Sequence, residues 1–133
     1  MSTFLDASVI VAILTREADA DSLSDRLDEL ETPMTSPLAI FESALGVAKK
    51  RKSTALEAAK DVRDFLEMAQ AAIVRITGED AELALSAFDR FGKGRHRAAL
   101  NMGDCFAYAC AKARNVPLLF KGDDFVHTDI AIA

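Results

Sequence analysis

The sequence predicts an α/β fold with a mostly parallel central sheet. Short apolar segments, several rich in β-branched residues, alternate with longer segments whose apolar residues recur every three or four positions. This alternation is typical of strands joined by helical crossovers, which build parallel sheets. The chain has 133 residues, half of them hydrophobic. It is therefore expected to form one domain over residues 1–133.

The expected strands are short and apolar, and two of them carry a proline near the beginning, where the missing N–H is tolerated. The third is rich in β-branched residues, and Thr77 and Gly78 end it. The last is expected at an edge of the sheet. The strand segments are 3–5, 32–36, 72–76, 116–120 and 129–133.

Six helices are expected, each with apolar residues at helical spacing. Their ranges are 7–14, 18–30, 38–51, 54–71, 79–91 and 101–115. Asp6 or Ser8 lies near the start of the first, Ser36 caps the third ahead of Pro37, and Ser53 caps the fourth. Several side chains are expected to face inward: Leu38, Phe41, Leu45 and Ala48; Leu56, Ala59, Val62, Phe65, Leu66 and Ala69; and Met102, Cys105, Phe106, Ala109, Cys110 and Ala113.

Composition excludes several classes of protein. The formal net charge of −5 argues against a general nucleic-acid binder, although residues 49–52 and 93–97 are locally basic. No apolar run approaches the roughly 20 residues needed to span a bilayer, and residues 1–8 lack the basic beginning of a signal peptide. Cys105 and Cys110 fit neither a disulfide framework nor a metal site. We therefore expect a reduced, cytoplasmic protein without a membrane partner.

Four acidic residues fall at related places in this pattern. Asp6 follows the first strand, Glu42 lies in the helix after the second, and Asp124 follows the fourth. The carboxyl ends of parallel strands share one edge, where ligands bind. Asp104 begins a helix that leads into a strand, so it reaches this edge only if the loop 92–101 first carries the chain across. The sequence thus suggests one cluster of four carboxylates.

Such a cluster is unfavourable unless a cation or protons neutralise part of its charge. Carboxylate oxygens suit Mg²⁺ or Mn²⁺. These ions lower the pKa of bound water and stabilise charge on a phosphoryl group. The pattern therefore indicates metal-dependent phosphodiester hydrolysis.

Four segments carry a resemblance to a known family. They are FLDASVIVAIL, SPLAIFESALGV, GKGRHRAALNMGDCFAYACAK and LLFKGDDFVHTDI. With these segments in the family's order, the chain resembles the PIN-domain ribonucleases, specifically the VapC-type toxins of toxin–antitoxin pairs. The resemblance implies a three-layer α/β/α fold and Mg²⁺- or Mn²⁺-dependent endoribonuclease activity. It also implies inhibition by a VapB-type antitoxin, a homodimer and a larger toxin–antitoxin complex.

The resemblance also assigns roles to residues. Asp6, Glu42 and Asp104 match the family's acidic metal positions, with Asp6 and Asp104 as principal ligands. Asp124 matches the fourth acid, although Asp123 beside it leaves that assignment open. Glu42 and Asp124 would bind the metal through water, or orient and deprotonate the attacking water. Ser8 matches a small hydroxyl residue that holds a carboxylate or a water.

Alternatives remain for these residues. Asp6, Asp104 and Ser8 also suit helix starts, and Asp124 suits a turn. The loop from Lys93 through Arg95 to Arg97 either is solvated or contacts RNA phosphates.

Two other functions remain open as well. One is a receiver-type phosphoacceptor domain, which would use Lys121 after a late strand. Against it, Ala7 replaces the second acid expected at the first strand end, and Ile76-Thr77-Gly78 lacks the aspartate expected at the third. The other is a catalytically silent binding module on the PIN fold.

Overall fold

A four-stranded parallel sheet lies at the centre of the computed structural model, which describes residues 2–133. Its strand order is β3–β2–β1–β4. The strands are β1 (Ser2–Leu5), β2 (Thr32–Thr35), β3 (Ala72–Ile73) and β4 (Leu118–Leu119). Phe4 aligns with Met34 of β2 on one side and with Leu118 of β4 on the other. The predicted α/β class with a parallel sheet is confirmed.

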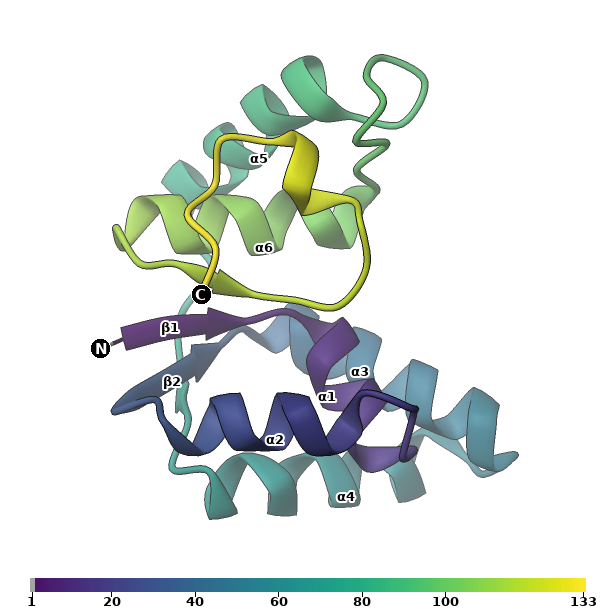
Figure 1. The fold of residues 1–133 in the computed structure, drawn as a ribbon. Coiled ribbons are helices and arrows are strands. Elements are labelled where there is room, and N and C mark those ends of the chain that lie inside the picture. Colours follow the sequence, from purple (N-terminus) through teal and green to yellow (C-terminus); the bar gives the residue numbers. More distant parts are fainter. Residues whose placement is uncertain (1) are drawn as a thin grey trace.

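Helices cover both faces of this sheet, which gives three layers (Figure 1). One face carries α5 (Gly78–Phe91) and α6 (Met102–Ala113). On the other lie α1 (Ala7–Leu14), α2 (Ala20–Asp28), α3 (Pro37–Arg51) and α4 (Ala55–Met68). Phe4 belongs to the core beneath α5 and α6, while the next residue, Leu5, belongs to the core beneath α1 and α2. This alternation is the period-2 geometry of a strand buried on both sides.

Local sequence signals place the helix starts. The Asp6 side chain caps α1, and Ser36 accepts from the Ala39 amide at 3.1 Å with Pro37 in the first turn of α3. The Ser36-Pro37 start was predicted, and Asp6 was one of the two residues expected near the start of α1, because capping depends on neighbouring residues. Ser53 was wrong as the cap of α4: Thr54 takes that place and accepts from the Glu57 amide at 3.1 Å.

Several side chains predicted to face inward are exposed. Phe41 is 60% exposed, Leu56 86% and Met102 66%; Leu45 and Ala113 are also exposed. The inner face of α3 consists mainly of small residues: Ala39, Ser43, Ala44, Val47 and Ala48. Small side chains let neighbouring helices approach closely, so the larger apolar residues of α3 fall outside the contact.

Strands in the second half of the chain are shorter than predicted. Within the segment 72–76 only Ala72–Ile73 forms a strand with β2. The Val74 amide makes one more hydrogen bond, to the Thr35 carbonyl at 2.9 Å, and the chain then turns to cap α5 with Thr77. Residues 129–133 form no strand; a single bridge joins Ile132 to Leu118 on the far side of β4. A 3₁₀ turn, η1 (Phe125–His127), precedes them. In the described chain, no helix is long and apolar enough to cross a membrane.

The two helices α5 and α6 are antiparallel. Arg114, at the end of α6, pairs at 3.2 Å with Asp80 at the start of α5. Because α6 leads into β4, α5 runs in the same sense as the strands and brings the chain to their carboxyl edge. The loop 92–101 then only reverses the direction of the chain, and a bridge between Gly92 and Leu100 joins the two ends of the loop. Asp104 thus reaches that edge through α5, not through a crossing of the loop as the sequence suggested.

Candidate functional site

Asp6 occupies the junction between β1 and α1 and is 6% exposed. Its Oδ2 accepts hydrogen bonds from the Ser8 amide at 3.1 Å and from the Ser8 hydroxyl at 2.5 Å. The Ser8 Oγ in turn accepts from the Lys121 amide at 3.0 Å. Burial raises the pKa of Asp6 against these hydrogen bonds, which lower it. Ser8 therefore fixes the carboxylate and connects it to the loop after β4.

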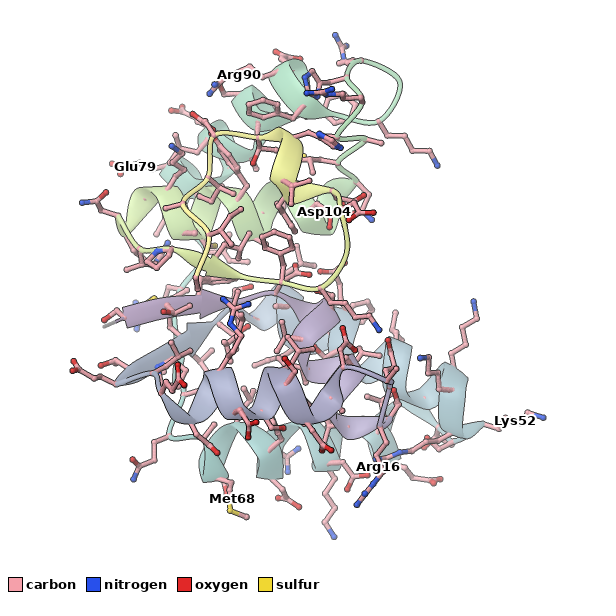
Figure 2. The ribbon with its side chains drawn as sticks, viewed as in Figure 1. Arg16, Lys52, Met68, Glu79, Arg90 and Asp104 are labelled. Carbon is pink, nitrogen blue, oxygen red and sulfur yellow. The ribbon has the colours of Figure 1, made fainter. Side chains whose placement is uncertain are left out.

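Asp104 lies in the first turn of α6, inside a capping box with Asn101. The Asn101 side chain accepts from the Asp104 amide at 2.9 Å, and the Asp104 carboxylate accepts from the Asn101 amide at 3.1 Å. Figure 2 shows Asp104 at the beginning of α6, on the side toward which β1 and β2 point. Burial and the charges of Asp6 and Asp124 raise the pKa of Asp104 to about 6, although the Asn101 amide lowers it.

Glu42 reaches the same place from α3, where it packs against the backbone of α6. A Cβ atom added at Gly103 would lie 1.9 Å from the Glu42 Oε2 and 2.3 Å from its Cδ. Any larger residue at 103 would therefore displace this carboxylate. Burial, with the charges of Asp6 and Asp104, raises the pKa of Glu42 to about 7.

These three carboxylates line one open pocket of about 430 Å³. The remaining lining residues are Ala7, Ser8, Val11, Glu17, Lys121 and Gly122. Asp124 is exposed on the loop after β4 and does not line the pocket. Its charge nevertheless raises the pKa of both Asp6 and Asp104. The sheet edge thus gathers three carboxylates whose ionised forms are disfavoured by burial and by neighbouring acidic charge.

The chemistry of this donor set fits a hard divalent cation. Carboxylate oxygens are the ligands that Mg²⁺ and Mn²⁺ prefer, and a cation would offset both the burial and the repulsion that raise these pKa values. Across residues 2–133, however, no three acidic, histidine or cysteine side chains stand close enough to enclose a metal ion as they are arranged. Binding of a cation would therefore require the carboxylates to draw together.

Two charged pocket residues were not predicted as part of the carboxylate site, and Lys121 was considered only for the receiver-type alternative. Glu17 follows α1, and Lys121 follows β4; their side chains form an ion pair. The position of Lys121 directly after a strand at the carboxyl edge was the available signal. Glu17 carries no such signal, because only the folded chain brings residues 104 positions apart into contact.

The predicted RNA-contacting side chains are exposed but lie outside the pocket lining. Lys93, Arg95 and Arg97 project from the loop that leads into α6. Arg95 lies over the ring of Phe88, with its guanidinium carbon 5.2 Å from the ring centroid. The loop therefore presents positive charge close in sequence to Asp104.

Residues 3–131 match the PIN domain family. The chain belongs to this family. A ribonuclease VapC of Mycolicibacterium smegmatis is 39% identical over 127 residues, which cover 96% of each chain. Ribonuclease VapC30 of Mycobacterium tuberculosis is 37% identical over 127 residues, covering 96% of this PIN-domain chain and 95% of its own. The resemblance inferred from four segments is confirmed.

Solved structures share the fold. The Mycobacterium tuberculosis toxin VapC20, described as cleaving the sarcin–ricin loop, superposes with a TM-score of 0.77 at 15% identity, covering 98% of both chains. A toxin–antitoxin complex from Klebsiella pneumoniae gives a TM-score of 0.72 at 16% identity, covering 98% of this chain and 96% of its own. The three-layer arrangement of this PIN domain is therefore shared with proteins of distant sequence.

Proposed function

We propose that this PIN-domain protein is a metal-dependent endoribonuclease and the toxin of a toxin–antitoxin pair. The observation that carries the proposal is the pocket lined by Asp6, Glu42 and Asp104, whose pKa values are all raised. Relatives that match nearly the whole chain are named as VapC ribonucleases, which supports the same activity. We expect the protein to act on RNA in the cytoplasm.

Asp6 and Asp104 would hold a Mg²⁺ or Mn²⁺ ion, with Glu42 and Asp124 binding it through water. When bound, the ion would lower the pKa of water and neutralise charge on the phosphoryl group. Ser8 keeps the Asp6 carboxylate oriented. The pKa of Glu42, about 7, suits a general base that takes a proton from the attacking water near neutral pH. Cleavage would leave a 5′-phosphate and a 3′-hydroxyl.

The exposed basic loop would position the RNA. Lys93, Arg95 and Arg97 offer charges to backbone phosphates, and such contacts orient a strand without selecting its sequence. Because this loop leads directly into α6, a strand held there would pass close to Asp104.

Protein partners form part of the proposal. The structural relatives include a VapBC2 complex from Rickettsia felis bound to promoter DNA and the Klebsiella pneumoniae toxin–antitoxin complex, which supports a VapB-type antitoxin and a larger toxin–antitoxin assembly here. An apolar groove of about 420 Å³ between α5 and α6, with Leu85 and Met102 exposed along it, supports a homodimer.

The test is cleavage of total cellular RNA by the purified protein with Mg²⁺ or Mn²⁺. Asp104→Asn removes one charge but keeps the side-chain shape and its capping contacts. Asp64→Asn, on an exposed part of α4, makes the same change away from the pocket and serves as the matched control. We expect wild type and Asp64→Asn to cleave at discrete sites, and Asp104→Asn or EDTA-treated samples to be at least 100-fold slower.

Equal cleavage by wild type and Asp104→Asn would refute the carboxylate site. Binding of Mn²⁺ by wild type without cleavage of any RNA would favour the silent binding module. Transfer of phosphate to the protein from a small phosphodonor would instead favour the receiver-type alternative.

A further inference from the structure

Lys121 brings a positive charge to a pocket dominated by carboxylates. It lies two residues after the short strand β4 and, among residues 2–133, is the one cation in the pocket lining. Its side chain is 34% exposed, so part of it is accessible from solvent. The lysine therefore stands where an anionic ligand would enter.

Two carboxylates hold this ammonium group at the pocket wall. The Lys121 Nζ donates to the Glu17 Oε1 and lies 3.0 Å from the Asp19 Oδ1. The second oxygen of Glu17 accepts from the Lys50 Nζ at 2.6 Å. Hydrogen bonds from Lys121 and then Lys50 lower the pKa of Glu17 to about 2, so Glu17 stays ionised at neutral pH. A flexible lysine is thus restricted to one region.

The backbone of the same residue is tied to Asp6. The Lys121 amide donates to the Ser8 Oγ, and the Ser8 hydroxyl donates to the Asp6 carboxylate. A change in the position of the loop after β4 would consequently alter the hydrogen bonding of the Asp6 carboxylate. Conversely, the ordered Asp6 and Ser8 fix the point from which the Lys121 side chain extends.

We propose that Lys121 contacts a backbone phosphate of bound RNA, with Glu17 and Asp19 acting as positioning residues for its ammonium group. This inference rests on the proposed ribonuclease function. A phosphate that approaches Asp6, Glu42 and Asp104 meets negative charge, and a lysine at the wall offsets it. Lysine is a suitable point charge for phosphate. Its partners are partly exposed carboxylates, and pairs of that kind are weak enough to exchange.

The experiment measures RNA binding and stability separately. Binding of a fluorescently labelled single-stranded RNA oligonucleotide is followed by anisotropy at several KCl concentrations with Mg²⁺, in an Asp104→Asn background that prevents cleavage. Lys121→Gln, Lys121→Arg, Glu17→Gln and Lys50→Gln are added singly. Lys50→Gln is the matched control, because Lys50 pairs with Glu17 but does not line this pocket. Thermal melting is recorded for each protein.

We expect Lys121→Gln to weaken binding about tenfold, the size of one charge-assisted hydrogen bond, and to lower the salt slope by about 0.7. Lys121→Arg should recover most of the affinity. Lys50→Gln should stay within about twofold of the background. Glu17→Gln, which removes a negative charge from the wall while leaving the lysine, should not weaken binding by more than about threefold.

A purely structural ion pair would give another pattern. Binding losses would then follow the fall in melting temperature, and Glu17→Gln, which breaks both lysine pairs, would lose at least as much as Lys121→Gln. That result, or unchanged binding by Lys121→Gln, overturns the inference. Cleavage by the Asp104-containing protein is assayed in parallel. Its absence refutes the proposed ribonuclease, while the binding comparison still decides the role of Lys121. Absence of RNA binding by wild type overturns both.

Discussion

Replacing Gly103 by alanine should separate activity from stability in this PIN domain. The added Cβ would lie 1.9 Å from the Glu42 Oε2, and real Cβ contacts essentially never fall under 3.0 Å. The carboxylate must therefore move by at least ~1.1 Å, the difference between those two distances. Because the end of a glutamate side chain is flexible, the displacement is inexpensive for the fold.

Two effects of opposite sign are expected. Alanine in place of glycine in a helix contributes up to about 1 kcal/mol to stability, so the melting temperature should stay constant or rise by ~2–4 °C. A catalytic group misplaced by about 1 Å can slow a reaction about 100-fold. The Gly103→Ala variant should therefore be folded and nearly inactive.

The assay is initial-rate cleavage of an RNA substrate together with thermal melting. Gly78→Ala is the control, since it also lies in a helix and its Cβ would meet nothing within 4 Å. We expect Gly78→Ala to keep full activity. Full activity in Gly103→Ala as well would refute the argument that the position of Glu42 matters, and a large loss of stability would show that the carboxylate cannot move aside.

Three further predictions follow from charge. In the folded protein the pKa of Glu42 is about 7, above its ordinary value of 4.5. Ionisation of Glu42 therefore destabilises the metal-free fold as the pH rises from 4.5 to about 7. Glu42→Gln should raise the melting temperature by a few degrees at pH 8 and leave it unchanged at pH 4. Burial raises the pKa of Asp80, but hydrogen bonds from Arg114 and Thr77 outweigh burial and hold it below its ordinary value of 3.8. Its stabilisation is present above about pH 4 and lost below, so in urea titrations Asp80→Asn should lower the free energy of unfolding by about 2 kcal/mol at pH 7 and by less at pH 2.5. Replacing all three basic side chains of the loop 92–101 by glutamine should lower the salt slope of RNA binding by about 2; an unchanged slope would mean that the loop is merely solvated. The loop side chains are Lys93, Arg95 and Arg97.

Features that depend on neighbouring residues were predictable from the sequence. The cap at Asp6, the Ser36-Pro37 start of α3 and the boundaries of α1 follow from local hydrogen bonding and backbone preference. The meeting of Asp6 and Glu42 at one edge followed from connectivity, because parallel strands end there. Asp104 joins them in the pocket by a route through α5 that connectivity did not predict. Their catalytic and metal-binding roles stay predictions.

Features that depend on the partner surface were not predictable. Apolar spacing in α3 identified Phe41 and Leu45 as a stripe, yet both are exposed, because spacing does not reveal which face another helix covers. The strand in the segment 72–76 ended at Ile73, with one further backbone hydrogen bond from Val74 to Thr35, since the start of α5 needed the chain that a longer strand would have used. The ion pair of Glu17 with Lys121 required knowledge of how two distant loops meet.

The position of β4 has a consequence for how the protein is made. Asp6, although near the beginning of the chain, receives support from its last quarter: its backbone amide donates to the Leu119 carbonyl at 3.0 Å, and Ser8 is held by the Lys121 amide. Chains emerge from the ribosome beginning at the amino terminus. A nascent chain that has not yet released the segment around residue 120 lacks one wall of the pocket. Complete assembly of the site therefore comes late in translation, after nearly all of the other elements have had time to fold.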